Sequence, residues 1–312
     1  MTNEIKLILP LQSLQFFATG NNEDLPVRRY TREFRDIVQT VFNKQAYFGD
    51  FSAGGVEALD GIKESATAFT VKTSDIPVVV RNYDKGANVG FGTGSHNSSR
   101  FGAVTEVIYV NTDVPYDDEW AFNEGLDNFT VNAELQAAVA DRLVLQGQAT
   151  TRRVDNAVAA YLDTNAGNTE ALADLTADNI NAMFTNLDEY YTDLEVDQTK
   201  VMKMTPALYN AIISNPLVVR EKGSSVDIDG NTVTTYRGFV LSKVPTSKLP
   251  AGTAALVYVP GIGKTFTGIA TTRTIQTEDF DGIKLQGAGK YGNWAPLDNL
   301  KAVTKVTLPT GP

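Results

Sequence analysis

The sequence predicts an α+β protein built around one long helix. This helix covers residues 130–163, where no proline occurs and apolar residues recur mostly three or four positions apart: Val131, Leu135, Ala138, Val139, Leu143, Val154, Val158 and Leu162. Strand-like runs precede and follow it, at residues 69–80, 104–110 and 271–308. At ~1.5 Å per residue the helix is roughly 50 Å long, which is much longer than the average helix of a globular protein. We therefore expect it to act as a spine on which the rest of the chain is laid.

Composition limits the classes of function that are open to this chain. It has 312 residues, of which 42% are hydrophobic, enough for a sizeable core and, by length, for about two domains. Because it contains no cysteine, disulfides, thiolate zinc sites and cysteine nucleophiles are excluded. The net charge of -10 has the wrong sign for a general nucleic-acid binder, which needs a basic face. Stability must come from packing and association.

The sequence carries no targeting or membrane signal. Residues 1–6 lack the basic region and the long apolar stretch of a signal peptide, and no run is long enough to span a bilayer. We expect the chain to fold in the cytoplasm, without contact to a membrane.

Residues 1–58 are predicted to form an N-terminal arm with a short helix. Residues 1–27 show no sustained period and contain prolines and glycines, which predicts an extended arm that becomes ordered against a partner. The short helix has one apolar face: Phe34, Ile37, Val38, Val41 and Phe42. Four arginines gather at its start: Arg28, Arg29, Arg32 and Arg35. They form either a solvated face paired with nearby acids or a surface that docks onto a neighbouring chain.

Residues 59–116 are predicted to form a projecting arm of two antiparallel strands, one over 69–80 and the other over 104–110. Residues 84–102 between them are rich in glycine and serine, and are too many for a tight hairpin turn. We expect a flexible tip there, with two candidate contacts to another copy of the chain: Lys85 and Phe91. An exposed ribbon of this kind invites aggregation unless another molecule covers it.

Clustered carboxylates lead from this arm into the long helix: Asp113, Asp117, Asp118, Glu119, Glu124 and Asp127. They lack the spacing of a calcium loop, although a divalent-cation site or an acid–base pair stays an alternative. Acids placed before a helix N-terminus also complement the helix dipole. A further interpretation is contact with the arginines near Tyr30 on an adjacent subunit, made by three candidate residues: Asp117, Asp118 and Glu119.

Residues 166–270 are predicted to form a smaller α/β region. A helical face runs from Ile180 to Tyr191, with Asp178 as the N-cap. Thr205 and Pro206 have the residue types of an N-cap and a first helical position. Four further elements are expected: a strand at 200–204, a helix at 207–214, a hairpin turning at Asp229–Gly230 and a strand at 254–259.

No complete catalytic or cofactor motif occurs. Gly261–Thr265 resembles the end of a phosphate-binding loop, but Tyr258 stands where the first glycine should be. The segment lies between two strand-like runs, so a glycine turn is the better interpretation. His96 is the only histidine, and no carboxylate lies next to it in the sequence to support a Ser/His/Asp arrangement. We predict that the chain is not an enzyme and has no catalytic residue, cofactor or metal.

The order of these elements resembles that of the major capsid proteins of tailed bacteriophages, of the Hong Kong 97 type. Thr205–Pro206 between a strand and a helix, and Tyr291–Trp294 before Asp298–Val303, are similar to capsid proteins of siphophages of Gram-positive hosts. The resemblance covers almost the whole chain. It implies four regions: an N-arm with a short helix at 1–58, an extended loop at 59–116, a peripheral domain with the spine helix at 117–165 and 271–312, and an axial domain at 166–270.

The resemblance implies a structural protein of the virion that self-assembles through pentamers and hexamers into an icosahedral shell. This shell would be assembled in the host cytoplasm and would enclose double-stranded DNA without specific binding. A portal protein is an implied partner, and so is a separate scaffolding protein, because the arm begins within a few residues of Met1. A bacterial encapsulin, which encloses cargo enzymes, is the alternative within the fold. Because glycine in a helix costs ~1 kcal/mol relative to alanine, we also expect a bend at Gly147 that follows the curvature of the shell.

Overall fold

The chain forms two compact units. The computed structural model describes residues 46–59, 67–74, 76, 78–86, 99–129, 135–215, 225–227, 232–268 and 271–308. The described part of the first unit comprises residues 122–129, 135–151 and 272–287, and the second unit contains the other described residues. The predicted N-arm helix and its arginines, the loop tip with Phe91 and His96, and the turn at Asp229–Gly230 lie outside the described residues.

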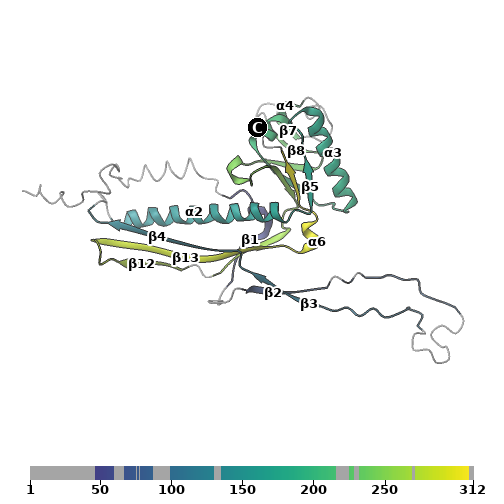
Figure 1. Ribbon diagram of the computed structural model, residues 1–312, viewed down its shortest axis with the longest axis horizontal. Coiled ribbons are helices and arrows are strands. Elements are labelled where there is room, and N and C mark those ends of the chain that lie inside the picture. Colours follow the sequence, from purple (N-terminus) through teal and green to yellow (C-terminus); the bar gives the residue numbers. More distant parts are fainter. Residues whose placement is uncertain are drawn as a thin grey trace, which may run out of the picture. The chain divides into compact units, whose positions relative to one another are not determined.

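The first unit combines part of a long helix with strands (Figure 1). The helix α2 spans Leu135–Thr164 and continues into the second unit. Strands β4 (Asp118–Asp127) and β12 (Thr271–Gln276) both pair with β13 (Gly282–Trp294). The predicted spine helix is thus confirmed from Leu135 onward, whereas residues 130–134 lie outside the described part of the chain.

Two glycines of the first unit differ in the space around them: Gly287 is crowded, whereas Gly147 is not. A Cβ atom on Gly287 of β13 would lie 2.2 Å from the ring of Phe122, so this glycine lets an aromatic ring of β4 approach the backbone. Gly147 lies inside α2, where no atom would come within 4 Å of an added Cβ. The helix continues through Gly147 without interruption, and the bend expected there stays a prediction.

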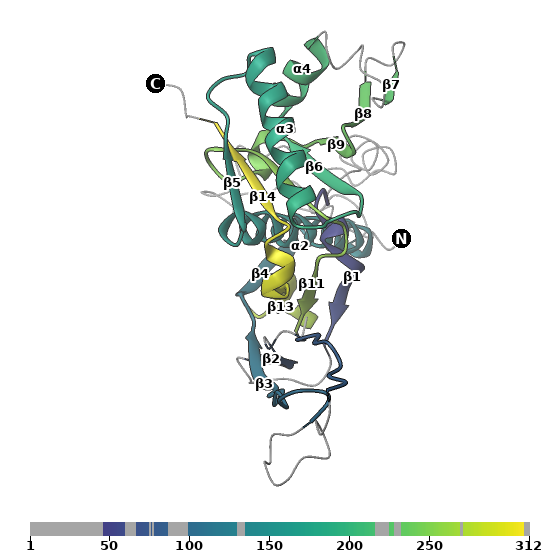
Figure 2. The same cartoon turned by 90° about the vertical axis from the view of Figure 1, so that its right-hand side faces the viewer.

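The second unit begins with a short strand that extends the sheet of β13 (Figure 2). The one-turn helix η2 (Gly49–Phe51) leads into β1 (Ser52–Ala58), which pairs in parallel with β11 (Gly263–Thr267). Strand β11 in turn pairs antiparallel with β13, where Thr265 lies opposite Asn293. The turn before β11 contains Gly261 with a φ of 76°, which confirms the predicted glycine turn at its first residues, whereas Gly263–Thr265 belong to β11.

The second unit also contains a seven-stranded sheet. Its strands lie in the order β5 (Asn168–Ala171), β14 (Thr304–Thr307), β10 (Thr253–Tyr258), β6 (Lys200–Met204), β9 (Phe239–Lys243), β8 (Thr232–Tyr236) and β7 (Ser225–Asp227). Helix α3 (Ala177–Asp193) covers one face of this sheet through its predicted apolar side, from Ile180 to Tyr191 (Figure 2). Every residue of β10 is buried, and its residues 254–258, within the predicted strand at 254–259, form an uninterrupted apolar run.

Helix α4 (Pro206–Ser214) begins as predicted, whereas the N-cap predicted for α3 is wrong. The hydroxyl of Thr205 accepts a hydrogen bond from the backbone N–H of Leu208 at 3.4 Å, and Pro206 occupies the first helical position. In α3 the N-cap is Thr176 and Asp178 lies in the first turn. The carboxylate of Asp174 holds this start by accepting the N–H of Thr176 at 2.9 Å.

Strands β2 (Thr67–Thr73) and β3 (Val110–Pro115) form a separate antiparallel pair, which confirms the predicted two-stranded arm near its base. The first predicted strand is wrong beyond Thr73, because residues 78–80 are not in a strand. Of the second, predicted over 104–110, only Val110 lies in β3. Valine and isoleucine favour a strand only where a partner strand or a packed surface lies beside them.

The start of the described chain is fixed to α2 by a buried carboxylate. Asp155 of α2 accepts hydrogen bonds from the backbone N–H groups of Tyr47 and Phe48 at 2.7 and 2.8 Å. Its other oxygen lies 3.2 Å from the ammonium of Lys248, at the end of the one-turn helix η3 (Thr246–Lys248). Another short helix, α6 (Leu297–Leu300), connects β13 to β14. No helix within the described ranges is long and apolar enough to cross a membrane.

Candidate interaction surfaces

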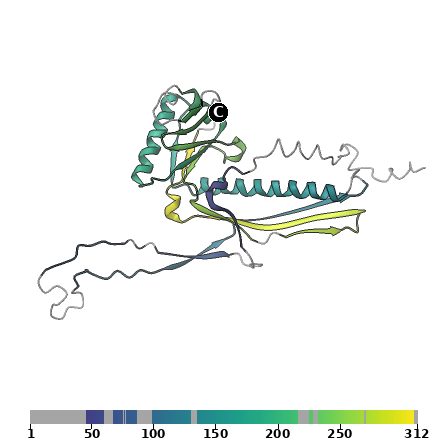
Figure 3. The same cartoon turned by 180° about the vertical axis from the view of Figure 1, so that it is seen from behind.

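Two segments that continue β2 and β3 expose apolar side chains. We call residues 78–86, after β2, and residues 99–109, before β3, the ribbon arms; they run alongside each other (Figure 3). Val78 and Val80 are each 91% exposed, and Val104 is 95% exposed. Six more large apolar residues of the arms are exposed: Val79, Tyr83, Phe101, Val107, Ile108 and Tyr109. Single exposed apolar residues are ordinary, but such a concentration marks an interaction surface.

Few hydrogen bonds join the two ribbon arms. The N–H of Asp84 donates to the carbonyl of Arg100 at 3.0 Å, and the guanidinium of Arg81 donates to the carbonyl of Ala103 at 3.1 Å. The rings of Tyr83 and Phe101 meet edge to face at 5.2 Å. Since no strand ladder joins the arms in the described part of the loop, backbone groups are left that a strand from another chain could pair with.

The base of the ribbon is anchored by aromatic packing. Phe69 of β2 lies edge to face on Phe266 of β11 at 5.1 Å and on Trp294 of β13 at 6.0 Å. Ala68 and Val114, one from each strand of the ribbon, are buried in the same cluster as Phe266. A packed base therefore carries two exposed arms, so the arms can present their apolar side chains without loss of the fold.

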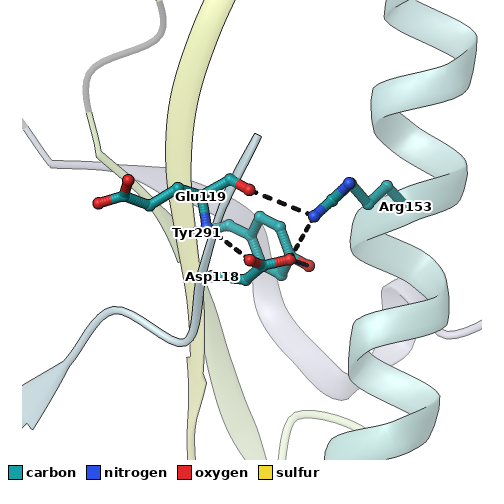
Figure 4. A network of polar contacts seen from close by, with 4 residues as sticks. All are labelled: Asp118, Glu119, Arg153 and Tyr291. Atoms are coloured by element: carbon teal, nitrogen blue, oxygen red, sulfur yellow. Dashed lines mark hydrogen bonds and ion pairs between the residues drawn. The ribbon is translucent and has the colours of Figure 1, made fainter. Parts of the chain in front are cut away.

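At the start of β4, Asp118 lies in a polar network (Figure 4). Its carboxylate accepts hydrogen bonds from the guanidinium of Arg153 on α2 and from the hydroxyl of Tyr291 at 2.8 Å. Arg153 also donates to the carbonyl of Glu119 at 3.2 Å. The hydrogen bond from Arg153 has the largest effect, and together these bonds lower the pKa of Asp118. This carboxyl group is therefore ionised at neutral pH.

The neighbouring Asp117 has the opposite environment. Burial raises the pKa of its carboxyl group, and hydrogen bonds from Asn293 oppose this rise. The backbone N–H of Asn293 donates to the Asp117 carboxylate at 2.7 Å, and the side-chain oxygen of Asn293 accepts from the hydroxyl of Thr265 at 2.9 Å. Asp117 is therefore linked through β13 to β11, beside the base of the ribbon.

The three candidate carboxylates have partners within the chain. Asp117 and Asp118 are held as described above, and Glu119 forms an ion pair with Lys290 at 2.9 Å. The expectation that they serve the dipole of the long helix is wrong, because they precede or open a strand and their partners are on α2 and β13. Their proposed contacts with another subunit stay a prediction. Lys85 lies exposed on a ribbon arm, whereas Phe91 and the four arginines lie outside the described residues.

Sequence reasoning missed the partners of these acids, which are Arg153, Lys290, Tyr291 and Asn293. Tyr291 and Asn293 belong to the Tyr291–Trp294 run that carries the family resemblance, but the run does not indicate a role for either. Arg153 carries no signal, because nothing in the helical pattern separates it from other polar positions of the helix. Within the described ranges, no group of metal-ligating side chains could hold a metal ion.

Several solved structures similar to this chain come from bacteriophages. The alignment with the capsid structure of cyanophage P-SCSP1u covers 95% of this chain and 94% of the cyanophage chain, with a TM-score of 0.64 and 12% sequence identity. The mature capsid of bacteriophage PhiM1 covers 86% and 89%, with a TM-score of 0.62 and 13% identity. A structure of Mycobacterium phage Che8 covers 76% and 83%, with a TM-score of 0.56 and 14% identity. No protein-family model and no curated protein matches the sequence. The predicted α+β fold of phage capsid structures is thus confirmed.

Proposed function

We propose that this chain is the major capsid protein of a tailed bacteriophage, a structural protein rather than an enzyme. The observation that carries the proposal is that the likeness to a phage capsid extends over 95% of the chain. The ribbon arms support it, because a chain that works alone would gain nothing from exposing Val78, Val80 and Val104.

The proposed organisation is that of the Hong Kong 97 type. Residues 1–58 would be the N-arm with its short helix, and residues 59–116 the extended loop that contains the ribbon arms. The axial domain would be residues 166–270, which hold most of the seven-stranded sheet and its helices. The peripheral domain would combine residues 117–165, with α2, and residues 271–312, with β12 and β13.

In this proposal the chain assembles with itself through pentamers and hexamers, in the host cytoplasm, into the icosahedral shell of the virion. A neighbouring copy covers the ribbon arms, which removes apolar side chains and unpaired backbone groups from water. Partners are a separate scaffolding protein and a portal protein. The net charge of -10 suits a wall that encloses double-stranded DNA without holding it.

The proposal is tested by producing the chain with and without its scaffolding protein and examining it by electron microscopy and analytical sedimentation. Capsomers and closed shells are the expected products. A chain that stays monomeric under both conditions would contradict the proposal. Shells that form alone and copurify with an enzyme, rather than with scaffolding protein, would favour the encapsulin alternative.

A further inference from the structure

A short segment of the second unit is held in the way that a protein holds a bound peptide. Residues 47–51, which we call the strap, precede β1 and are not in a strand. The strap contacts two elements that are far from it in the sequence, helix α2 and the seven-stranded sheet. These contacts are of three kinds: to the backbone of the strap, to a carboxylate and to two aromatic rings.

Helix α2 binds the backbone of the strap. One oxygen of the Asp155 carboxylate accepts the N–H groups of Tyr47 and Phe48, at 2.7 and 2.8 Å. Asp155 is buried, and hydrogen bonds to a charged acceptor are stronger where water is excluded. This contact recognises an extended backbone rather than a particular side chain.

The sheet binds the carboxylate of the strap. Asp50 Oδ2 lies 2.8 Å from the ammonium of Lys203 on β6, and Asp50 Oδ1 accepts the hydroxyl of Tyr258 on β10 at 2.6 Å. The backbone carbonyl of Asp50 accepts the N–H of Gly261 at 2.8 Å. Because Lys203 is buried, loss of Asp50 would leave a shielded ammonium without this carboxylate. Lys203 therefore selects an acidic residue at this position of the strap.

Two aromatic rings of the strap complete the contact. Phe48 and Phe51 are fully buried, in one apolar cluster with Leu162 of α2 and Leu256 of β10. The ring of Phe51 also meets the ring of Tyr161 on α2 edge to face, at 5.8 Å between centroids. The site thus binds a pattern of four residues: an aromatic residue, an unspecified residue, an acid and an aromatic residue.

We propose that the strap is an intramolecular peptide ligand, which leaves its site on α2 and the sheet as one unit, and that this site also binds other peptides of the same pattern. Gly49 occupies the unspecified position, because an added Cβ would meet no atom within 4 Å. A partner that carries such a peptide would displace the strap from α2. The proposal does not rest on the capsid function, because it concerns the single subunit.

Hydrogen exchange of the full-length wild type tests whether the strap opens by itself. The amides of Phe48 and Gly261 bond on two different sides of the strap, so they should exchange through one shared opening. This opening should be at least about tenfold more frequent than that of the buried strand β10. Strap amides that exchange only together with β10 would overturn the proposal, because the strap would then not leave its site separately.

Substitutions on one side of the strap should be felt on the other side. Asp50→Asn removes the charge that faces Lys203, and it should raise the exchange rate of the Phe48 amide about tenfold, although that amide bonds to Asp155. Asp155→Asn should in turn raise the exchange rate of the Gly261 amide. Effects confined to the amides beside each substitution would contradict an opening as one unit.

The matched control for these variants is Asp163→Asn. Asp163 also lies on α2, but its carboxylate accepts a hydrogen bond directly from the hydroxyl of Thr253 on β10, at 2.6 Å. This variant should leave the exchange of the strap amides unchanged. Faster exchange of these amides in Asp163→Asn would show that they report on the whole contact between helix and sheet, and would refute a separate strap.

A labelled synthetic peptide of residues 46–52 tests recognition, with fluorescence anisotropy as the measurement. Its host is the full-length Phe51→Ala variant, whose own strap is weakened; the full-length Asp50→Asn variant is a second host in case the first misfolds. The peptide should bind saturably, and a peptide with Asp50→Asn should bind about tenfold more weakly. Adding Lys203→Met to the host should abolish this difference. Equal binding of the two peptides to hosts that keep Lys203, or no binding of either, would rule out the peptide site.

Discussion

Adjacent residues at the start of β4 respond to pH in opposite directions. Burial raises the pKa of Asp117, whereas the hydrogen bonds from Arg153 and Tyr291 lower the pKa of Asp118. Neighbouring residues in an extended backbone point to opposite sides, so one carboxyl group can be partly buried while the next meets a guanidinium. Their contributions to stability therefore have opposite slopes with pH.

Replacing Asp117 by Asn should remove one of these slopes. Because the pKa of Asp117 in the folded chain is raised above its ordinary 3.8, the folded state holds this proton more tightly than the unfolded state. The wild type therefore loses stability as the pH rises through the raised pKa, and Asp117→Asn should lack this loss, since an amide oxygen still accepts the Asn293 N–H. Urea unfolding from acidic to neutral pH measures the difference.

Asp118→Asn is the matched control for this experiment. The lowered pKa of Asp118 stabilises the fold above 3.8, and this stabilisation is lost as the pH falls through the lowered value. The control should therefore be less stable than the wild type at neutral pH and approach it in acid. Parallel pH profiles for the wild type and Asp117→Asn would show that Asp117 has the same pKa in both states.

Removing the buried carboxylate of Asp155 should lower the stability of the subunit more than removing an exposed carboxylate does. Its side chain is 2% exposed and accepts two backbone N–H groups, and its loss would also leave the ammonium of Lys248 without its buried partner. Asp155→Ala should lower the free energy of unfolding by about 3–5 kcal/mol, as measured by urea unfolding. The exposed Asp188→Ala on α3 should change it by less than about 0.5 kcal/mol. Equal effects of the two substitutions would contradict the anchoring role.

The sequence could not reveal Asp155 or Asp141 as buried acids. Both lie in a helix whose predicted apolar face is buried at Ala138, Val154, Val158 and Leu162 but exposed at Leu143. A carboxylate is buried only where distant groups surround it. For Asp155 these groups are Tyr47 and Phe48, more than 100 positions away in the sequence. The helix start at Thr205 and Pro206 was predicted correctly. This was possible because a helix cap involves only residues that are neighbours in the sequence.

At the scale of elements, the ribbon shows the limit of strand propensity. β2 and β3 form where Ala68 and Val114 are buried, although both residues lie outside the predicted strands at 69–80 and 104–110. The ladder between the two strands ends at Thr73 and Val110. Beyond it, Val104 and its neighbours keep their β-branched composition without a packed surface. These residues favour a strand, but they have no partner strand within the described part of the chain.

Making the ribbon arms polar should separate folding from assembly. In the triple variant Val78→Ser, Val80→Ser and Val104→Ser, each substitution should change the subunit's free energy of unfolding by less than about 0.5 kcal/mol, because the side chains are at least 91% exposed. Formation of capsomers and shells should be strongly reduced, since the covered apolar area is lost. Urea unfolding and sedimentation measure the two effects.

The control for the ribbon variant is Leu297→Ser, which changes a large apolar residue that is 80% exposed in α6. This variant should form shells normally if the ribbon arms are the apolar surface that neighbouring copies bind. Normal shells from the ribbon variant would mean that neighbouring copies do not bind the arms through these valines.

The junction of β1 with β11 depends on close backbone approach at Gly263. A Cβ atom there would lie 2.2 Å from the ring of Phe51 and 2.8 Å from the carbonyl oxygen of Trp294. Gly263→Ala should therefore destabilise the subunit by about 1–3 kcal/mol, measured by urea unfolding. Gly54→Ala in β1 is the control, because no atom lies within 4 Å of the added Cβ. A neutral Gly263→Ala would show that Phe51 moves aside without cost.

At the scale of the whole molecule, the sequence predicted the order of elements better than the surfaces they present. The long helix, the two-stranded arm and the α/β region follow from periods and turn residues that lie within short windows. The surfaces are different in kind, because no local pattern indicates what covers an exposed side chain. Under the proposed function, other copies of the chain cover Val78 and Val104, which a free subunit exposes.

Gly147 connects the stability of the subunit with the geometry of the shell. It lies inside α2, where alanine is favoured by ~1 kcal/mol and where an added Cβ meets no other atom. Gly147→Ala should therefore raise the free energy of unfolding of the isolated subunit by about 0.5–1 kcal/mol, measured by urea unfolding. If α2 must bend there to follow a curved wall, the same substitution should slow shell closure or shift the distribution of particle diameters in electron micrographs. Ala149→Gly in the same helix is the control, because it should lower the free energy of unfolding without stiffening α2. A more stable subunit that forms shells of normal size at the normal rate would show that Gly147 is tolerated in the helix and is not a point of curvature.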